Sequence, residues 1–135
     1  MDFCLIFFIA NIDTQINVVR SHIFGPDVLR TYKYAEGRFY LTKQTKLRLN
    51  LVAEYMLAQK KPLVIHAHSD RTASRKNYKR LSQQRGDTVK KYLLAKGVSP
   101  EKLIVRAYGT SRPLATNRTR EGRAMNRRIE LSFPF

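Results

Sequence analysis

One carboxylate and one guanidinium stand at a spacing that could bring them to a single site. Asp70 ends the tripeptide His68-Ser69-Asp70, and Arg85 ends Leu81-Ser82-Gln83-Gln84-Arg85, fifteen residues further along. A carboxylate binds an ammonium group and a guanidinium binds a carboxylate through charge-assisted hydrogen bonds. The pair therefore suits a small zwitterion such as an amino-acid head group. No activated nucleophile stands beside it, so binding is favoured over catalysis.

The same residues allow simpler interpretations. The two side chains can pair with each other to satisfy a half-buried arginine. The run His66-Ala67-His68-Ser69-Asp70 also begins a metal motif of metallo-β-lactamase-like hydrolases, but Arg71 stands where that motif needs another histidine, and His22 is the only further one. A hydrolytic metal site needs more ligands than these. We therefore expect no metal, no cofactor and no enzyme activity, and we place His66 and His68 on one face of a strand.

Composition places these residues on one folded, strongly basic chain. The 135 residues include 26 Lys and Arg against 10 Asp and Glu, giving a formal net charge of +16, and 43% are hydrophobic. That hydrophobic content is typical of a folded domain, so the charge must lie on its surface. A surface this basic attracts polyanions. The dense cluster from Arg118 to Arg128 keeps polyanion or nucleic-acid binding open as the rival function.

The first 38 residues form an extension of uncertain structure. The apolar segment Phe3–Ala10 is too short to span a bilayer and fits either a buried strand or a truncated export signal. Turn residues at Gly25-Pro26-Asp27 and at Glu36-Gly37 indicate short strands or irregular structure. Cys4 is the only cysteine, so the chain has no intrachain disulfide. We expect no transmembrane span.

Two helices and a strand must position the Asp70 and Arg85 pair. Thr42 is suited to cap a helix that runs to Lys60, with an apolar face of Leu47, Leu51, Val52, Tyr55 and Met56. Leu63–Ala67 is almost continuously apolar, as expected of a central strand. A second helix is expected from Ser74 to Lys96, ending at Gly97, with Arg85 on its buried face.

The remaining pattern completes a mixed fold. Lys102–Tyr108 and Arg128–Phe133 alternate like strands, and Thr119–Met125 is expected to form a short helix. The order β-α-β-α-β-(α)-β predicts an α/β fold, an α+β sandwich with a mixed sheet and helices packed on one side. Asp70 then follows the carboxyl end of the central strand, where binding loops gather.

Several motifs occur in a fixed order along the rest of the chain. His68-Ser69-Asp70 and Leu81-Ser82-x-x-Arg85 are followed by Val89-x-x-Tyr92-Leu93 with Gly97-Val98, by Arg106-Ala107-Tyr108-Gly109 and by Gly122-Arg123-x-x-Asn126-Arg127-Arg128. From about Phe39 to Leu131 the chain thereby resembles the OmpA-like C-terminal domain of OmpA, peptidoglycan-associated lipoprotein and the flagellar stator proteins MotB and MotY. Residues 39–135 are identified as this domain, and residues 1–38 as an extension that could be the remnant of a longer exported protein.

The resemblance implies a non-catalytic domain that binds the diaminopimelate of the peptidoglycan stem peptide. Asp70 would take the amine and Arg85 the carboxylate of that residue, while Ser69 and the backbone around Thr72 line the pocket. The expected site is completed by Asn77, Tyr78, Arg127 and Arg128. Such a domain would anchor an outer-membrane, periplasmic or flagellar-stator protein to the cell wall in the periplasm, if the chain is exported. Peptidoglycan is the expected partner. Further expected partners are an outer-membrane or flagellar motor complex and a second copy of the chain, whereas nucleic acid is less favoured.

The chain departs from the family pattern beside the expected pocket. Ala67 and Ala73 replace glycines, and Gly86 replaces a small alanine. The Tyr-Asn order is inverted to Asn77-Tyr78, which moves the asparagine about 100° around a helix. We therefore expect an altered pocket shape and affinity around an unchanged aspartate and arginine.

Overall fold

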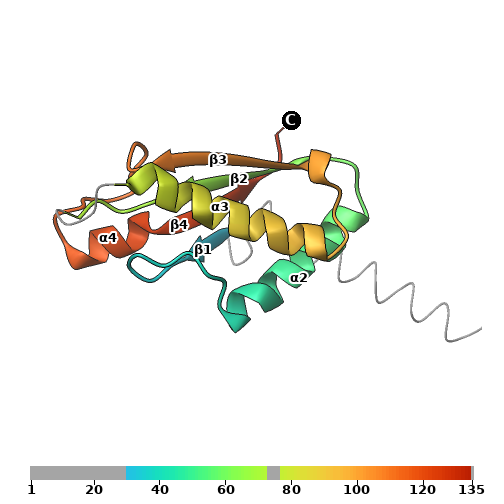
Figure 1. Cartoon of the computed structure of the whole chain (residues 1–135), viewed down its shortest axis with the longest axis horizontal. Coiled ribbons are helices and arrows are strands. Elements are labelled where there is room, and N and C mark those ends of the chain that lie inside the picture. Colours follow the sequence, from blue (N-terminus) through green and yellow to red (C-terminus); the bar gives the residue numbers. More distant parts are fainter. Residues whose placement is uncertain (1–29, 73–76, 135) are drawn as a thin grey trace, which may run out of the picture.

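A four-stranded mixed sheet carries the fold, and two long helices lie over one of its faces (Figure 1). This computed structural model describes residues 30–72 and 77–134. The strands are β1 (Thr31–Lys33), β2 (Leu63–His68), β3 (Leu103–Gly109) and β4 (Arg128–Ser132). The helices are α2 (Lys43–Leu57), α3 (Tyr78–Ala95) and α4 (Arg120–Asn126), with a 3-10 turn, η1, at Pro100–Lys102. The predicted element order and fold class are confirmed.

The strand order in the sheet is β1-β4-β2-β3. β2 is parallel to β3 and antiparallel to β4, and β4 is antiparallel to β1. β2 is therefore an interior strand, as its apolar sequence predicted. Because Ala67 pairs with Ile129, the start of β4 lies beside the end of β2.

β1 lies within residues 1–38, which the sequence assigned to the extension. Tyr32 pairs with Ile129 and is fully buried, so the sheet begins before residue 39. The predicted turn at Glu36-Gly37 is present, with Gly37 at φ 69°. A three-residue edge strand is too short for alternation to fix its bounds in the sequence. The Phe3–Ala10 segment and the predicted turn at residues 25–27 lie outside the described residues.

α2 begins where the sequence predicted but presents a different face to the core. The Thr42 side chain accepts a hydrogen bond from the Thr45 N–H at 3.2 Å, which caps the helix. The predicted core residues Leu47 and Leu51 are wrong, since they are 59% and 36% exposed. The buried stripe consists of Leu49, Val52, Ala53, Tyr55 and Met56. The leucines of this helix spread over more than one face, so the sequence allowed two choices of buried face. Packing on the sheet selected the face that contains Leu49.

α2 also ends earlier than the predicted Lys60. Leu57 is its last residue, and the Gln59 side chain accepts from the Lys61 N–H at 3.0 Å. Pro62 disfavours helical geometry at Lys61, so the chain leaves the helix before it.

α3 ends as predicted, in a left-handed glycine. Gly97 has φ 96°, and the N–H groups of Gly97 and Val98 donate to the carbonyls of Leu94 and Leu93 at 3.0 and 3.2 Å. This pair of hydrogen bonds is the Schellman motif. The predicted start at Ser74 is wrong, because Asn77 is the non-helical cap and Tyr78 the first helical residue. For the other predicted elements, each end either agrees with the observed one or lies one residue away from it.

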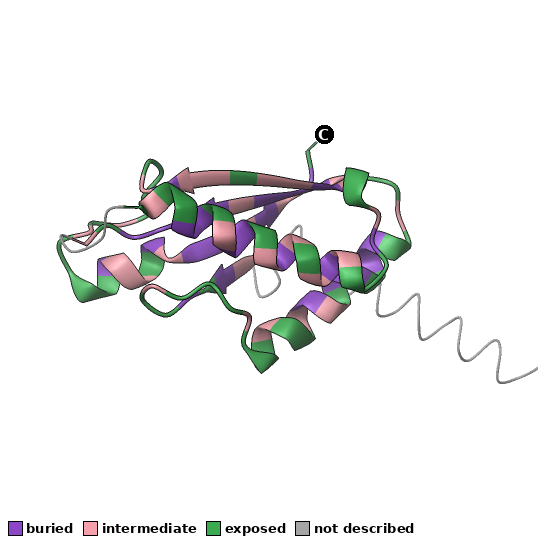
Figure 2. Cartoon of the chain, in the orientation of Figure 1, coloured by how far each residue is buried: buried purple, intermediate pink, exposed green. Residues whose placement is uncertain are grey.

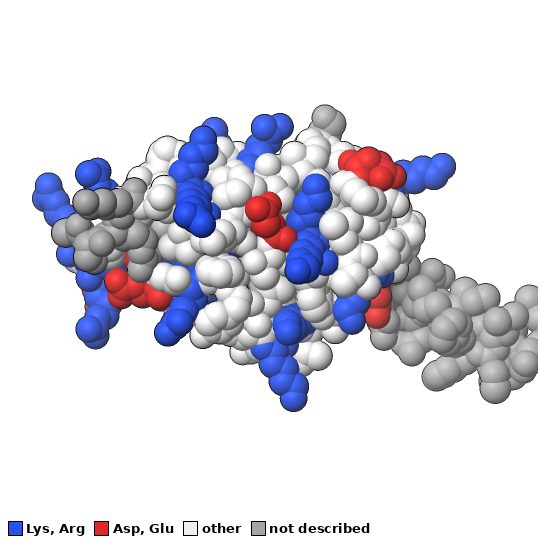
Figure 3. All heavy atoms as spheres, viewed as in Figure 1, with Lys and Arg blue, Asp and Glu red and all other residues white. Residues whose placement is uncertain are grey.

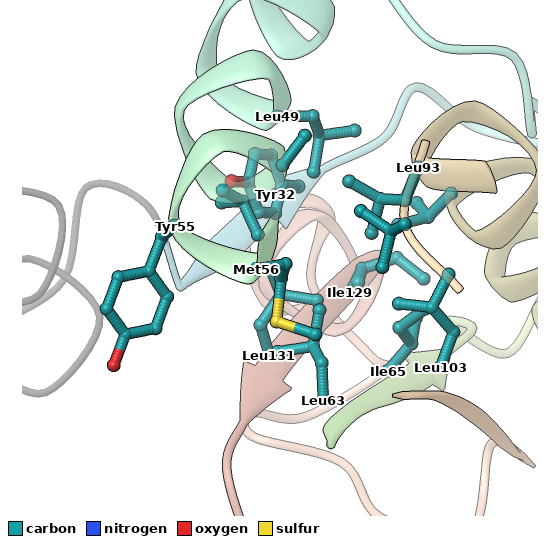
Figure 4. Packing of buried hydrophobic residues seen from close by; sticks show 14 of the residues in the cluster. Tyr32, Leu49, Tyr55, Met56, Leu63, Ile65, Leu93, Leu103, Ile129 and Leu131 are labelled. Atoms are coloured by element: carbon teal, nitrogen blue, oxygen red, sulfur yellow. The ribbon is translucent and has the colours of Figure 1, made fainter. Parts of the chain in front are cut away.

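One hydrophobic cluster fills the space between the two long helices and the sheet. Figure 4 shows side chains from both helices converging on those of the strands. Along α2 and α3, the buried residues form stripes with exposed residues between them (Figure 2). The fully buried members include Tyr32, Leu49, Met56, Ile65, Leu93 and Ile129. This core holds α3, and therefore Arg85, against the end of β2.

Gly86 marks the closest approach of α3 to the sheet. A Cβ at this position would lie 2.5 Å from Cγ1 of Val105 and 3.4 Å from Cβ of Ala67. Overpacking of this kind costs about 1–3 kcal/mol, whereas alanine is favoured over glycine in a helix by about 1 kcal/mol. We expect Gly86→Ala to destabilise the protein, and to stabilise it by about 1 kcal/mol when Val105→Ala has removed the clash.

Urea unfolding of both single variants and of the double variant measures this coupling. An equal effect of Gly86→Ala in the two backgrounds would contradict the assigned contact.

Candidate functional site at the end of strand β2

The register of the sheet brings the chain entering β4 beside the chain leaving β2. Arg127 precedes β4, and its Nη1 donates to Oδ2 of Asp70 at 3.3 Å. The Asp70 side chain has no solvent exposure and that of Arg127 only 14%. Asp70 is thus half of a buried ion pair, and its partner is Arg127 and not Arg85. The interpretation that Asp70 and Arg85 pair with each other is wrong.

The second carboxylate oxygen of Asp70 remains available. Its Oδ1 is buried and accepts no hydrogen bond. A buried acceptor without a partner costs about 1–3 kcal/mol, and more when it is charged. Oδ1 is therefore a fixed acceptor to which a cationic donor would bind favourably.

Arg85 lies on the buried face of α3, as predicted, and is fully buried. Its Nε donates to the Arg38 carbonyl at 2.8 Å, its Nη1 to the His68 carbonyl at 3.0 Å and its Nη2 to the Ala35 carbonyl at 3.4 Å. The guanidinium therefore bridges the segment after β1 and the end of β2. Its bond to His68 holds it near Asp70, two residues along.

Tyr34 connects the two arginines. The guanidinium carbon of Arg85 lies 4.9 Å from the centre of the Tyr34 ring, and the Arg127 Nε donates to the Tyr34 carbonyl at 2.9 Å. Burial raises the pKa of Tyr34 above its ordinary value, so the ring stays neutral. Sequence reasoning missed this residue because a lone aromatic near a short edge strand carries no signal of its own.

Arg127 and Arg128 were expected in one site, but the structure separates them. Neighbouring residues of a strand point to opposite faces, so Arg128 lies on the side of the sheet away from Arg85. There its Nε donates to Oε1 of Glu130 at 2.7 Å and its Nη2 to the Arg112 carbonyl at 3.1 Å.

The remaining predicted residues surround the loop that follows Asp70. Ser69 is buried, and its hydroxyl donates to the Asp70 carbonyl at 3.1 Å. The Tyr78 hydroxyl accepts from the Thr72 N–H at 3.1 Å and donates to the carbonyl of the same residue. Asn77 is exposed and makes no capping bond with its side chain. Three of these four residues therefore shape the loop next to Asp70, and Asn77 lies at its rim.

The glycine and asparagine of the Gly122 to Arg128 motif hold the loop after β3 in place. Asn126 accepts from the Ala115 N–H at 3.0 Å and donates to Oδ1 of Asn117 at 2.9 Å. The same Asn117 oxygen accepts from the Arg71 N–H at 3.1 Å. At Gly122, a Cβ would lie 1.9 Å from a carbonyl oxygen of this loop. The motif thus joins the loop after β3 to the loop that carries Asp70.

A second polar group lies on the opposite side of the sheet, which we call the open face and define by His66, His68, Tyr108, Arg128 and Glu130. His66 interacts through Nδ1 with the Tyr108 hydroxyl at 2.9 Å, and the His68 ring stacks on Tyr108 with centres 5.1 Å apart. His66 and His68 therefore share one face of β2, as predicted. Burial, and secondarily the charge of Arg128, lowers the pKa of His68 to about 4.

The arginine cluster from Arg118 to Arg128 is divided by the fold. Arg118 and Arg120 are exposed, but Arg123 donates to the Asn117 carbonyl at 3.0 Å. Arg127 and Arg128 form the ion pairs described above. Lysine and arginine side chains are otherwise spread over the visible face, with few acidic ones between them (Figure 3).

Two negative observations apply to residues 30–72 and 77–134. No group of three or more His, Cys, Asp or Glu residues there could hold a metal ion. Within the same residues, no helix has the length and apolar character needed to cross a membrane.

Comparison with known proteins gives matches over most of the described chain. A model of the OmpA family matches residues 33–127. Peptidoglycan-associated lipoprotein of Pseudomonas aeruginosa is 34% identical over 103 residues, which are 76% of this chain and 61% of that protein. Peptidoglycan-binding protein ArfA of Mycobacterium bovis is 39% identical over 84 residues, 62% of this chain and 26% of that protein. The chain spans less than two thirds of the length of these curated relatives.

The fold is also found in a solved structure. The crystal structure of the peptidoglycan-associated lipoprotein from Burkholderia pseudomallei matches with a TM-score of 0.77 at 20% sequence identity, over 86% of this chain and 99% of that one. At this low identity the structural match supports a shared fold alone. The mixed sheet and its helices therefore form a known architecture.

The buried ion pair leads to a stability prediction. Removing one partner of a buried pair leaves an uncompensated charge and costs about 3–5 kcal/mol. We expect Arg127→Met to destabilise the protein by about 3 kcal/mol, and Asp70→Asn to cost less because asparagine keeps a neutral acceptor. The double variant should be more stable than the sum of the two losses predicts.

Urea unfolding of the four proteins measures this pair directly. Additive losses would show that the contact at 3.3 Å contributes no coupling.

The buried His68 leads to a prediction for pH dependence. Its pKa is about 4 in the folded state against 6.5 for an ordinary histidine, so the unfolded chain binds a proton between these values and the folded chain does not. The free energy of unfolding should therefore fall as the pH falls from about 6.5 to about 4, by at most about 3 kcal/mol. Urea unfolding at a series of pH values measures it.

His68→Gln is the control, because glutamine keeps polar atoms and cannot titrate. We expect a shallower pH dependence in this variant. An unchanged slope would assign the effect to other groups.

Proposed function

The chain belongs to the OmpA family, and we propose that its domain binds peptidoglycan without catalysis and anchors a cell-envelope protein to the wall. Two relatives carry an association with peptidoglycan in their names: a peptidoglycan-associated lipoprotein and a peptidoglycan-binding protein. Neither name is that of an enzyme. The proposal places the domain in the periplasm, with an outer-membrane or flagellar motor complex as the structure that it tethers.

The observation that carries the proposal for the ligand is the state of Asp70. Arg127 occupies Oδ2, while the buried Oδ1 has no hydrogen-bond partner. An ammonium group would supply both the missing donor and a compensating charge. Diaminopimelate in a stem peptide presents a free ammonium and a free carboxylate on one carbon, and we assign the ammonium to Oδ1 of Asp70.

Arg85 is the proposed partner of the ligand carboxylate. A guanidinium carries five N–H donors in a fixed plane. Of the three bonds from Arg85 to backbone carbonyls described above, the one from Nη2 to Ala35 is the longest, at 3.4 Å. A carboxylate is a stronger acceptor than a backbone carbonyl. Exchange of this long bond for a bond to the ligand would therefore be favourable.

Arg127 has a positioning role in this proposal. Its bonds to Asp70 and to the Tyr34 carbonyl fix which carboxylate oxygen faces the ligand. Ser69, Thr72, Asn77 and Tyr78 form the wall of the pocket on the side of the loop after β2. Arg128 lies on the open face and contributes through the position of β4.

The rival function, polyanion or nucleic-acid binding by residues 118–128, has less support. Two of its arginines, Arg127 and Arg128, hold intramolecular carboxylates. Such binding would weaken steeply as the salt concentration rises, and it would not depend on Asp70.

The test is co-sedimentation of the purified chain with peptidoglycan sacculi at about 0.15 M salt, where exposed charges are screened. We expect Asp70→Asn and Arg85→Lys each to weaken binding at least about tenfold, the loss of one charge-assisted hydrogen bond. Asparagine and lysine retain much of the size and polarity of the buried originals. Circular dichroism and thermal unfolding identify any variant that fails to fold.

Arg118→Gln is the matched control, because it removes a positive charge from an exposed position. It should bind sacculi like the unaltered protein. Undiminished sedimentation of folded Asp70→Asn and Arg85→Lys would overturn the proposed site. Loss of binding in Arg118→Gln, with Asp70→Asn binding like the unaltered protein, would favour the polyanion function.

A further inference from the structure

A cavity of about 360 Å³ lies on the open face of the sheet. Its described walls come from β1, β2, β4 and the end of β3 with the loop that follows, and they include His68, Tyr108, Arg112, Arg128 and Glu130. This volume is within the range of about 300–1,000 Å³ that is typical of small-ligand sites. Since Arg85 lies on the helix-covered side of the sheet, the cavity is separate from the proposed peptidoglycan site.

Two buried side chains in this cavity have polar atoms without partners. Arg128 is 3% exposed, and its Nη1 makes no hydrogen bond, although its Nε and Nη2 are bonded. His68 is also 3% exposed, and neither of its ring nitrogens makes a hydrogen bond. Its Nε2 lies 4.0 Å from Oε2 of Glu130. Buried donors in this state are costly, and a ligand that accepts from them recovers that cost.

The charge around the cavity is predominantly positive. The Arg112 guanidinium lies 4.1 Å from the centre of the Tyr108 ring, the same ring on which His68 stacks. Burial is the main cause that lowers the pKa of His66 and of Lys33, and Glu130 opposes it at both. Arg112 and Arg106 lower the pKa of His66 further, and Arg128 lowers that of Lys33. Among the described lining residues, Glu130 is the only acid. Burial raises the pKa of Glu130, but the hydrogen bond and charge of Arg128, together with smaller effects of His68 and His66, lower it overall.

We propose that this cavity binds a small ligand through a phosphate group, held by the Arg128 Nη1, the Arg112 guanidinium and a ring N–H of His68. The three donors come from β4, from the loop after β3 and from β2. A phosphate presents three terminal oxygens in three directions and can accept from all of them. A carboxylate presents two oxygens in one plane, which is the match for a single arginine fork. The remaining volume of the cavity would accommodate the group that carries the phosphate.

The neutral state of His68 supports this assignment. With a pKa of about 4, the ring is uncharged at pH 7 and donates from one nitrogen only. A bound phosphate dianion would stabilise the protonated ring and raise its pKa. Phosphate binding should therefore shift the titration of His68 toward neutral pH, which a ligand bound elsewhere would not do.

The test is a titration of the full chain with inorganic phosphate, glycerol 3-phosphate and succinate at pH 7 and about 0.15 M salt, followed by nuclear magnetic resonance of the histidine side chains. Free phosphate and a phosphate ester separate the two sources of the group. We expect saturable binding of at least one phosphate probe, with a shifted His68 resonance, and weaker binding of succinate.

Arg112→Gln is the diagnostic variant, because its side chain is exposed and the Arg128 bond uses its backbone carbonyl. It should weaken phosphate binding about tenfold, the equivalent of one charge-assisted hydrogen bond. Arg120→Gln, an exposed arginine outside the cavity, should leave it unchanged. The proposal is overturned if neither phosphate probe saturates, if succinate binds as well as phosphate, or if Arg112→Gln and Arg120→Gln weaken binding equally.

Discussion

The buried ion pair between Asp70 and Arg127 is the interaction on which the site depends. It joins two residues 57 positions apart, at the point where β2 ends and β4 is about to begin. A buried pair gains little net stability because desolvation offsets the attraction between the charges. Its effect here is geometric, since it fixes the orientation of the carboxylate and leaves one buried oxygen for a ligand. The Arg85 guanidinium, held by backbone carbonyls from two segments, faces the same region from the helix side.

The antiparallel placement of β4 next to β2 explains why two adjacent arginines act on different sides of the sheet. Arg127, before the strand, reaches the loop after β2, while Arg128 begins the strand and points to the open face. Each is matched by a carboxylate, Asp70 on one side and Glu130 on the other. The same two residues therefore link the helix-covered site and the cavity on the open face. Within the basic run from Arg118 to Arg128, three of the five arginines therefore stabilise the sheet and its loops through intramolecular contacts.

Local sequence signals were sufficient for the order of the elements, the cap at Thr42, the left-handed Gly97 and the burial of Arg85. Each of these depends on neighbouring residues or on helical periodicity. The partner of Asp70, the role of Tyr34 and the bounds of the short strand β1 could not be predicted, because they depend on which strands pair and in which register. The choice between Leu47 and Leu49 for the core was missed for a related reason. Both lie on an apolar helix surface, and only the packing of that helix on the sheet decides between them.

The central claim is that Asp70 and Arg85 together recognise one residue with a free ammonium and a free carboxylate. Its most direct test is a titration of the isotope-labelled chain with two stem peptides that differ only at the third residue, diaminopimelate in one and lysine in the other. Lysine keeps the ammonium and lacks the carboxylate, so Arg85 has no partner to bind. The account predicts that the diaminopimelate peptide binds at least about tenfold more tightly and shifts the resonances of Asp70 and Arg85. Equal affinity for the two peptides, or shifts confined to other parts of the chain, would contradict it.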